Sequence, residues 1–127
     1  RAARAYGRVA VLTNKPLAPT EQVLQGLGLR ALVDDVIGGD GPHGRKPDPA
    51  GLHALMERAA AGATHTLLVG DSAIDHETAG NAGARCCLVG YGFGRHTIRA
   101  DQLSGDEWRV ESASELPEVF RQFIGRT

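Results

Sequence analysis

Four residues carry side chains suited to holding a phosphoryl group beside a divalent cation: Thr13, Lys46, Asp71 and Asp75. The two carboxylates offer the hard oxygen ligands that Mg²⁺ takes together with waters and phosphate oxygens. The Lys46 ammonium would offset charge on the phosphoryl oxygens, and the Thr13 hydroxyl with nearby backbone N–H groups would complete the site. These residue types therefore predict a site for phosphate and Mg²⁺.

Lysine is scarce in this chain, which draws attention to Lys46. Only Lys15 and Lys46 are lysines among the fourteen basic residues, and all the others are arginine. A lysine in such a chain suggests a role that a broad planar guanidinium could not fill. Asn14, directly after Thr13, is a further candidate for substrate binding, whereas Lys15 is open to a role at the site or to facing solvent.

Strands and helices must bring these side chains together. Apolar, β-branched runs predict five strands, at residues 8–12, 33–37, 66–70, 85–89 and 109–111. Four helical segments lie between or after them. Three are expected to begin at the N-caps Thr20, Asp48 and Ser114, and a fourth covers residues 75–82. The glycines expected to end helices are Gly28, Gly62 and Gly83.

Alternating strands and helices predict an α/β fold with a parallel, Rossmann-like sheet and helices on both faces. Residues 1–127 are expected to form one domain. In such sheets the working groups lie at the carboxyl ends of the strands, which is where the four residues fall. The glycine-rich stretch at 90–94 lacks the strand–turn–helix context of a dinucleotide site and is expected to be a wall beside the site.

Three segments resemble motifs of the haloacid dehalogenase superfamily. They are VLTNKP at 11–16, GRKPDP at 44–49 and VGDSAID at 69–75, in that order and at plausible spacing. The likeness covers most of residues 7–125 and is closest to phosphoglycolate phosphatases. It implies a Mg²⁺-dependent phosphomonoester hydrolase that acts through an aspartyl-phosphate, with phosphoglycolate as the best single substrate. By the same resemblance Thr13 binds phosphate, Lys46 is the catalytic loop lysine, and Asp71 and Asp75 bind Mg²⁺.

The chain departs from that family at the nucleophile. The family's attacking aspartate lies in a D-x-D-G-T stretch, and no aspartate here has another two residues later. The small cap domain between that stretch and the T-N-K motif is also missing. The resemblance therefore implies the C-terminal part of such an enzyme, inactive alone. The absent strand would lie between residues 9–12 and 66–69, which predicts two unpaired inner edges. A segment of a longer protein, or a second copy in a homodimer, could fill the gap.

Other functions compete with this interpretation. A noncatalytic module that binds Mg²⁺ and phosphate would need no nucleophile. A phosphosugar mutase usually has a second motif different from T-N-K, and a dehalogenase needs no acidic pair for Mg²⁺. Receiver domains of response regulators also combine acidic residues, Thr and Lys, but there the acidic residues come first.

Each site residue also has a simpler interpretation. Asp71 could be a turn residue and Asp75 a helix N-cap, as aspartate often is. Ser72 is expected to support the loop by hydrogen bonding. His43 and His76 lie close to the motifs but are expected to face solvent rather than bind metal.

Composition excludes several classes of protein. The formal charge of −1 argues against binding nucleic acid or an anionic membrane through bulk charge. No apolar run approaches the length of a membrane span. The two cysteines, Cys86 and Cys87, are adjacent and cannot join distant segments, so a disulfide scaffold is excluded. A small phosphorylated metabolite is the expected partner, and the cytoplasm the expected location.

Overall fold

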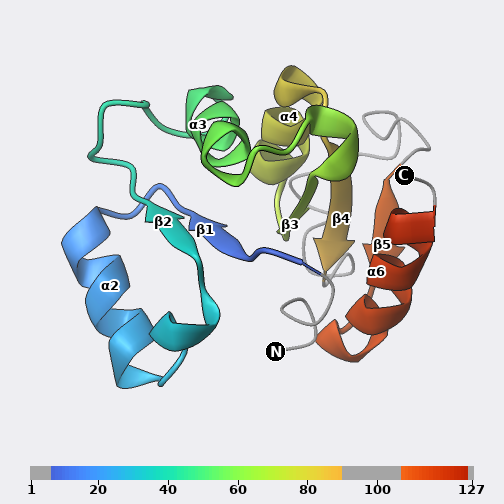
Figure 1. Ribbon diagram of the computed structural model, residues 1–127, viewed down its shortest axis with the longest axis horizontal. Coiled ribbons are helices and arrows are strands. Elements are labelled where there is room, and N and C mark those ends of the chain that lie inside the picture. Colours follow the sequence, from blue (N-terminus) through green and yellow to red (C-terminus); the bar gives the residue numbers. More distant parts are fainter. Residues whose placement is uncertain (1–6, 90–106, 126–127) are drawn as a thin grey trace.

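The computed structural model describes residues 7–89 and 107–125, in which strands and helices alternate (Figure 1). Its strands are β1 (Ala10–Leu12), β2 (Asp35–Ile37), β3 (Leu67–Gly70), β4 (Arg85–Val89) and β5 (Trp108–Val110). Its α-helices are α2 (Leu17–Gly26), α3 (Ala50–Ala59), α4 (Ala73–Ala82) and α6 (Leu116–Gly125). Short 3₁₀ turns cover Arg30–Leu32, Ala63–His65 and Ala113–Glu115. The predicted α/β class is confirmed, and no helix in the described ranges has the length and apolar character needed to cross a membrane.

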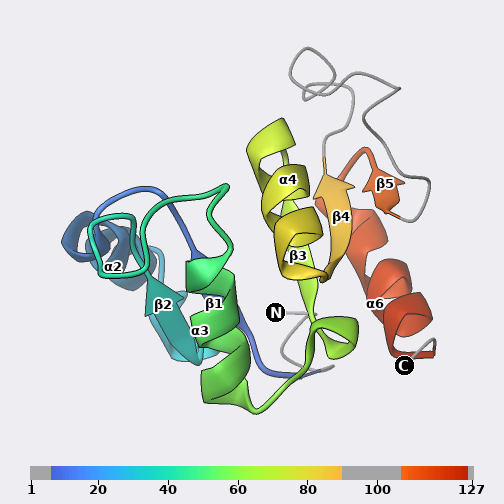
Figure 2. The same ribbon diagram turned by 90° about the horizontal axis from the view of Figure 1, so that it is seen from above.

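The strands form two parallel sheets instead of one. β1 pairs with β2, with Val11 opposite Val36. β4 lies between β3 and β5 and pairs with both in parallel. Within the described residues no strand joins β1 to β3, and Figures 1 and 2 show the two sheets as separate halves of the molecule. This arrangement agrees with the two unpaired inner edges predicted for β1 and β3.

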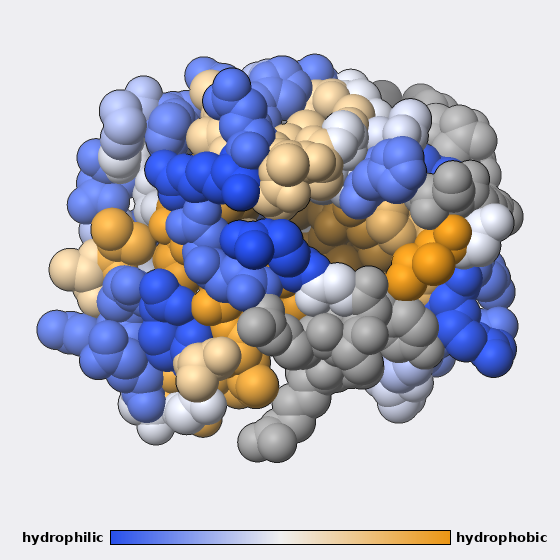
Figure 3. All heavy atoms as spheres, in the orientation of Figure 1, coloured by the Kyte–Doolittle hydropathy of each residue, from blue (hydrophilic) through white to orange (hydrophobic). Residues whose placement is uncertain are grey.

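An apolar groove of about 650 Å³ lies between these inner edges. Residues 9–12 and 67–69 form two of its walls, and α3 and α6 add Leu52, Met56, Leu116 and Phe123. Figure 3 shows apolar side chains in a hollow on one face of the molecule. Strands buried on both faces of a parallel sheet are apolar throughout, so the groove has the character that suits an additional β-strand.

Alternate residues of β4 contact different helices. Cys86 and Leu88 pack with α4, whereas Cys87 packs with α6, as the two-residue period of a strand requires. The apolar face of α3 packs with Leu12 from β1 and Leu68 from β3. Helix α3 is therefore an apolar connection between the two sheets.

Both cysteines are expected to resist alkylation in the folded protein. Burial is the main cause that raises the pKa of Cys86 to about 12 and of Cys87 to about 11. At pH 8 the reactive thiolates are then about a hundredfold rarer, or more, than in the unfolded chain. Iodoacetamide followed by mass spectrometry should label them only after unfolding in urea, and rapid labelling of the native protein would contradict their burial. Between about pH 9 and pH 11 the thiols ionise in the unfolded chain but stay protonated in the folded one. The free energy of unfolding should therefore fall as the pH rises above about 9.

Helix α2 begins three residues before the predicted cap. Thr20 lies buried inside the helix, and its hydroxyl donates to the Pro16 carbonyl at 2.9 Å. The predicted N-cap at Thr20 is therefore wrong. The Leu17 N–H donates to Asp40 Oδ1 at 2.9 Å. A carboxylate 23 residues away thus accepts a hydrogen bond from one of the first backbone N–H groups of α2, which have no partner within the helix.

The ends of α3 and α4 illustrate two ways of stopping a helix. Asp48 Oδ1 accepts the Ala50 N–H at 2.9 Å, close to the predicted start of α3. The helix ends before Gly62, because Ala60 adopts the left-handed conformation with φ 54°. Gly83, with φ 74°, ends α4 as predicted.

The strand predicted at 85–89 is confirmed at both ends, and residues 90–94 lie outside the described ranges.

Candidate active site

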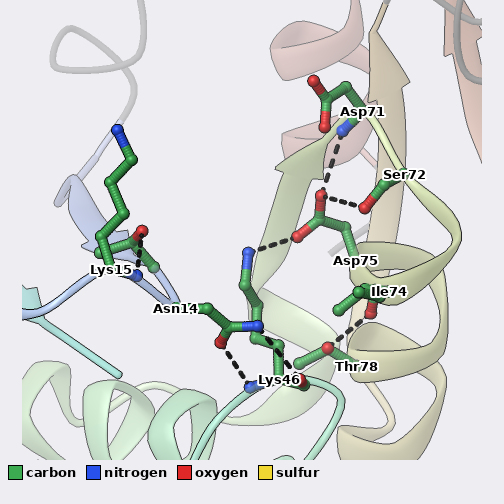
Figure 4. A network of polar contacts seen from close by, with 9 residues as sticks. Asn14, Lys15, Lys46, Asp71, Ser72, Ile74, Asp75 and Thr78 are labelled. Atoms are coloured by element: carbon green, nitrogen blue, oxygen red, sulfur yellow. Dashed lines mark hydrogen bonds and ion pairs between the residues drawn. The ribbon is translucent and has the colours of Figure 1, made fainter. Parts of the chain in front are cut away.

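An ion pair between Lys46 and Asp75 lies where the two halves of the molecule meet (Figure 4). Lys46 comes from the loop between β2 and α3, and Asp75 from the first turn of α4. Lys46 Nζ lies 2.6 Å from Asp75 Oδ1, and the two side chains are only 15% and 8% exposed. A carboxylate so withdrawn from water needs charged or polar partners, and the Lys46 ammonium is one of them.

The second oxygen of Asp75 accepts hydrogen bonds from the two residues just before α4. Asp75 Oδ2 accepts the Asp71 N–H and the Ser72 hydroxyl, both at 3.2 Å. These contacts lie at the start of α4, where a negative charge also interacts favourably with the helix dipole. The expected supporting role of Ser72 is confirmed. Asp75 is not the N-cap that its simpler interpretation predicted, since Ser72 occupies that position and Asp75 lies in the first turn of α4. It stabilises the helix start with one oxygen and binds Lys46 with the other.

Asp71 follows β3 directly and differs from Asp75 in its surroundings. Its side chain is exposed, and its carboxylate makes no hydrogen bond or ion pair with the described residues. Only its backbone N–H contacts Asp75. The two aspartates therefore lie at the same end of β3, one carboxylate open to solvent and the other buried.

Gly70→Ala is expected to disturb the ion pair. A Cβ at Gly70 would lie 2.3 Å from Asp75 Cγ, so the carboxylate would have to move. We expect a loss of about 1–3 kcal/mol of unfolding free energy, measured by urea denaturation. Gly80→Ala, on the exposed face of α4, is the matched control. A Cβ there meets no heavy atom within 4 Å, and better helix propensity should stabilise the protein by about 0.5–1 kcal/mol. A Gly70→Ala protein as stable as the parent would contradict this close packing.

Thr13 and Asn14 follow β1 and have different contacts. The Thr13 N–H donates to the Ile37 carbonyl at 3.1 Å, which continues the pairing of β1 with β2. Its hydroxyl accepts the Lys15 N–H at 3.1 Å. The Asn14 amide instead bonds to the Lys46 backbone, through Oδ1 at 2.7 Å and Nδ2 at 3.2 Å. Hydrogen bonds and an ion pair thus join Asn14, Lys46, Asp75 and Asp71. The Thr13 hydroxyl instead bonds within its own turn.

Two further polar contacts near the site were not predicted. Asn81 Nδ2 donates to the Pro47 carbonyl at 3.0 Å, across 34 residues of sequence, and no local pattern points to it. His76 was expected to face solvent, but its Nε2 lies 3.1 Å from the buried carboxylate of Glu107. That prediction is wrong, because residue 107 becomes a neighbour of α4 only through the strand order β3–β4–β5.

The donor set at this end of β3 fits a magnesium ion. The described residues contain no group of three His, Cys, Asp or Glu side chains able to bind a metal, so a closed site of protein ligands is absent from that part of the chain. Mg²⁺ in phosphate-handling sites is typically held by one or two carboxylates, with waters and phosphate oxygens as the remaining ligands. Asp71 and Asp75 provide such a pair.

The chain has clear relatives among known proteins. It is 45% identical over 122 residues to a phosphoglycolate phosphatase of Cereibacter sphaeroides (strain ATCC 17029 / ATH 2.4.9), covering 95% of this chain and 54% of that protein. It is 44% identical over 91 residues to a phosphoglycolate phosphatase of Rhodospirillum rubrum, covering 72% and 38%. The crystal structure of a predicted phosphoglycolate phosphatase from Haemophilus somnus 129PT superposes with a TM-score of 0.81 at 27% identity, covering 93% of this chain and 52% of that one.

These comparisons extend over most of this chain but only part of its relatives. The chain spans about half the length of these relatives, or less. Residues 4–89, which contain all five predicted site residues, match the model of the family described as haloacid dehalogenase-like hydrolase. The resemblance found in the three motifs is confirmed, and this chain belongs to the haloacid dehalogenase-like hydrolase family.

Proposed function

We propose that this chain is the phosphate- and Mg²⁺-binding part of a phosphomonoester hydrolase that acts on phosphoglycolate or a similar small phosphorylated metabolite. The Lys46–Asp75 ion pair carries this proposal, because it holds a cation and a carboxylate together at the strand ends, next to the open carboxylate of Asp71. The phosphoglycolate phosphatases at about 45% identity support the choice of substrate.

Each residue has a distinct role in this proposal. Thr13 and neighbouring backbone N–H groups bind the phosphoryl oxygens, and Lys46 offsets their charge. Asp71 and Asp75 hold Mg²⁺, which when bound would neutralise phosphoryl charge as a Lewis acid. Lys46 would then lie between an anionic substrate and the Asp75 carboxylate that it contacts in the structure.

The nucleophile has to come from outside this chain. We propose that a strand carrying an attacking aspartate occupies the groove between β1 and β3 and forms an aspartyl-phosphate during turnover. The groove supports this, because its walls are mostly apolar and both flanking strands have unpaired edges within the described residues. We propose that another segment of a longer protein supplies this strand, because a second copy of this chain would lack the D-x-D sequence as well.

The test uses the intact protein that contains this chain. Phosphate release from 2-phosphoglycolate should require Mg²⁺ and stop with EDTA. Acid quenching during turnover should trap a phosphoprotein that hydroxylamine cleaves, as an acyl phosphate requires. The isolated 127-residue chain should show no turnover. Metal-independent hydrolysis, or activity of the isolated chain, would overturn the proposed mechanism.

A noncatalytic module is the second candidate, favoured by the absence of a D-x-D sequence from the chain. Such a module would bind phosphate and Mg²⁺ and cleave nothing. Calorimetry with inorganic phosphate and Mg²⁺ tests it, and no heat of binding at millimolar phosphate would reject it. In either case we propose a cytoplasmic protein without nucleic-acid or membrane partners, consistent with two free buried cysteines.

A further inference from the structure

Two asparagines from different parts of the fold hold the loop that carries Lys46. Asn14, after β1, binds both polar groups of the Lys46 backbone: Oδ1 accepts its N–H at 2.7 Å and Nδ2 donates to its carbonyl at 3.2 Å. Asn81, on α4, donates to the carbonyl of the next residue, Pro47, at 3.0 Å. These are the only asparagines in the chain, and both bind this dipeptide. Figure 4 shows the Asn14 amide facing the Lys46 backbone.

The side chain of Lys46 extends from this fixed backbone to Asp75 (Figure 4). A lysine side chain has four flexible bonds, so the position of its ammonium depends on where its backbone is held. Helix α4, which packs on β3 and β4, carries both Asp75 and Asn81, whereas Asn14 follows β1 of the other sheet. The two asparagines therefore fix the Lys46 backbone relative to both sheets.

We infer that Asn14 and Asn81 are positioning residues that aim the Lys46 ammonium at the phosphate site. The expected effect of these residues on turnover rests on the proposed function. Their effect on the position of the Lys46 ammonium does not. It changes the expectation that Asn14 binds substrate, because the oxygen and the nitrogen of its amide are both engaged with Lys46. The hydrogen bonds of Asn14 to the loop act on substrate only through Lys46.

The first test measures how accessible the Lys46 amine is, without any assay of activity. The chain has two lysines, and exposed Lys15 is the internal reference. Limited acetylation of the intact protein, mapped by mass spectrometry, should modify Lys46 more slowly than Lys15. Asn14→Leu should raise the ratio of Lys46 to Lys15 modification by about five- to tenfold, the factor that a lost hydrogen bond produces. Asn81→Leu should raise it less, because it removes one bond instead of two.

The controls separate positioning from general destabilisation. Gln25→Leu makes the same amide-to-leucine change on the exposed face of α2, and it should leave the ratio unchanged. Asn14→Asp keeps the acceptor for the Lys46 N–H and loses the donor, so it should give an intermediate ratio if Asn14→Leu fails to fold. Thermal melts establish which variants are folded. An unchanged ratio in a folded Asn14 variant would overturn the inference.

The second test uses a double-mutant cycle in phosphatase activity. Asn14→Leu should lower kcat/KM of the parent by about tenfold, yet change little when added to Lys46→Met, because it acts through Lys46. Equal losses in both backgrounds would show direct binding of substrate by Asn14 and overturn the inference. If the intact protein hydrolyses no phosphomonoester, the proposed function fails, while the acetylation ratio still decides the positioning role.

Discussion

Asp71→Asn in the intact protein is expected to lower Mg²⁺-dependent turnover by about 10³-fold or more, the loss that follows when a metal ligand's charge is removed. The fold should be unaffected, since the Asp71 carboxylate is exposed and binds none of the described residues. Steady-state kinetics across a Mg²⁺ titration, with a thermal melt of the same sample, checks both parts. Full activity would remove Asp71 from the metal site.

The matched control for this variant is Asp48→Asn. Asp48 lies two residues after Lys46, is exposed, and accepts the Ala50 N–H. An asparagine oxygen accepts the same hydrogen bond, so activity and stability should remain close to those of the parent. Asp75→Asn is less informative, because it removes a proposed metal ligand and the partner of Lys46 together.

Lys46→Met should reduce both turnover and stability. The variant keeps the length of the side chain and removes the ammonium, leaving the buried Asp75 carboxylate with two neutral donors, the Asp71 N–H and the Ser72 hydroxyl. We expect a cost of about 2–4 kcal/mol, below that of a fully buried pair because Lys46 is 15% exposed. Turnover should fall by about 10²–10³-fold with the loss of charge at the phosphoryl oxygens.

Lys15→Met is the control, since it removes the only other lysine of the chain. Lys15 is exposed and its ammonium forms no ion pair with the described residues, so the change in stability should stay within about 0.5 kcal/mol. Urea denaturation of both variants at pH 7 gives the comparison. If Lys46→Met were as stable and as active as Lys15→Met, the ion pair would have neither the structural nor the catalytic importance proposed for it.

Local sequence patterns predicted most elements of the fold but not all of their ends. The strand at 85–89 and the glycine end of α4 depend on nearby residues, and both were correct. The start of α2 depends on Asp40, which reaches Leu17 only through the folded loop after β2. Likewise, α3 ends at Ala60 in a conformation that glycine usually adopts, so Gly62 was a misleading signal. A tertiary contact therefore decided the start of α2, whereas α3 ends at the left-handed conformation of Ala60.

The candidate site shows the same division. Residue types and motifs identified Lys46 and Asp75, each expected to act on phosphate or metal. Their direct contact at 2.6 Å was not predicted, because 29 residues separate them and nothing in the sequence gives the path of the loop. The hydrogen bonds from Asn14 and Asn81 to the backbone of Lys46 and Pro47 were not predicted for the same reason. The roles of these residues toward phosphate and Mg²⁺ remain predictions.

Two sheets without a shared strand should open as separate cooperative units in native-state hydrogen exchange. Cys87 and Leu88 of β4 are almost fully buried, whereas all of β1 is partly or fully exposed. Amides of β4 should therefore be protected for longer than those of β1. A strand seated in the groove would add backbone hydrogen bonds to both inner edges and fuse the two units. The folding cooperativity of this chain would then depend on the segment that supplies the strand, so that the active site and the stable fold are completed in one event.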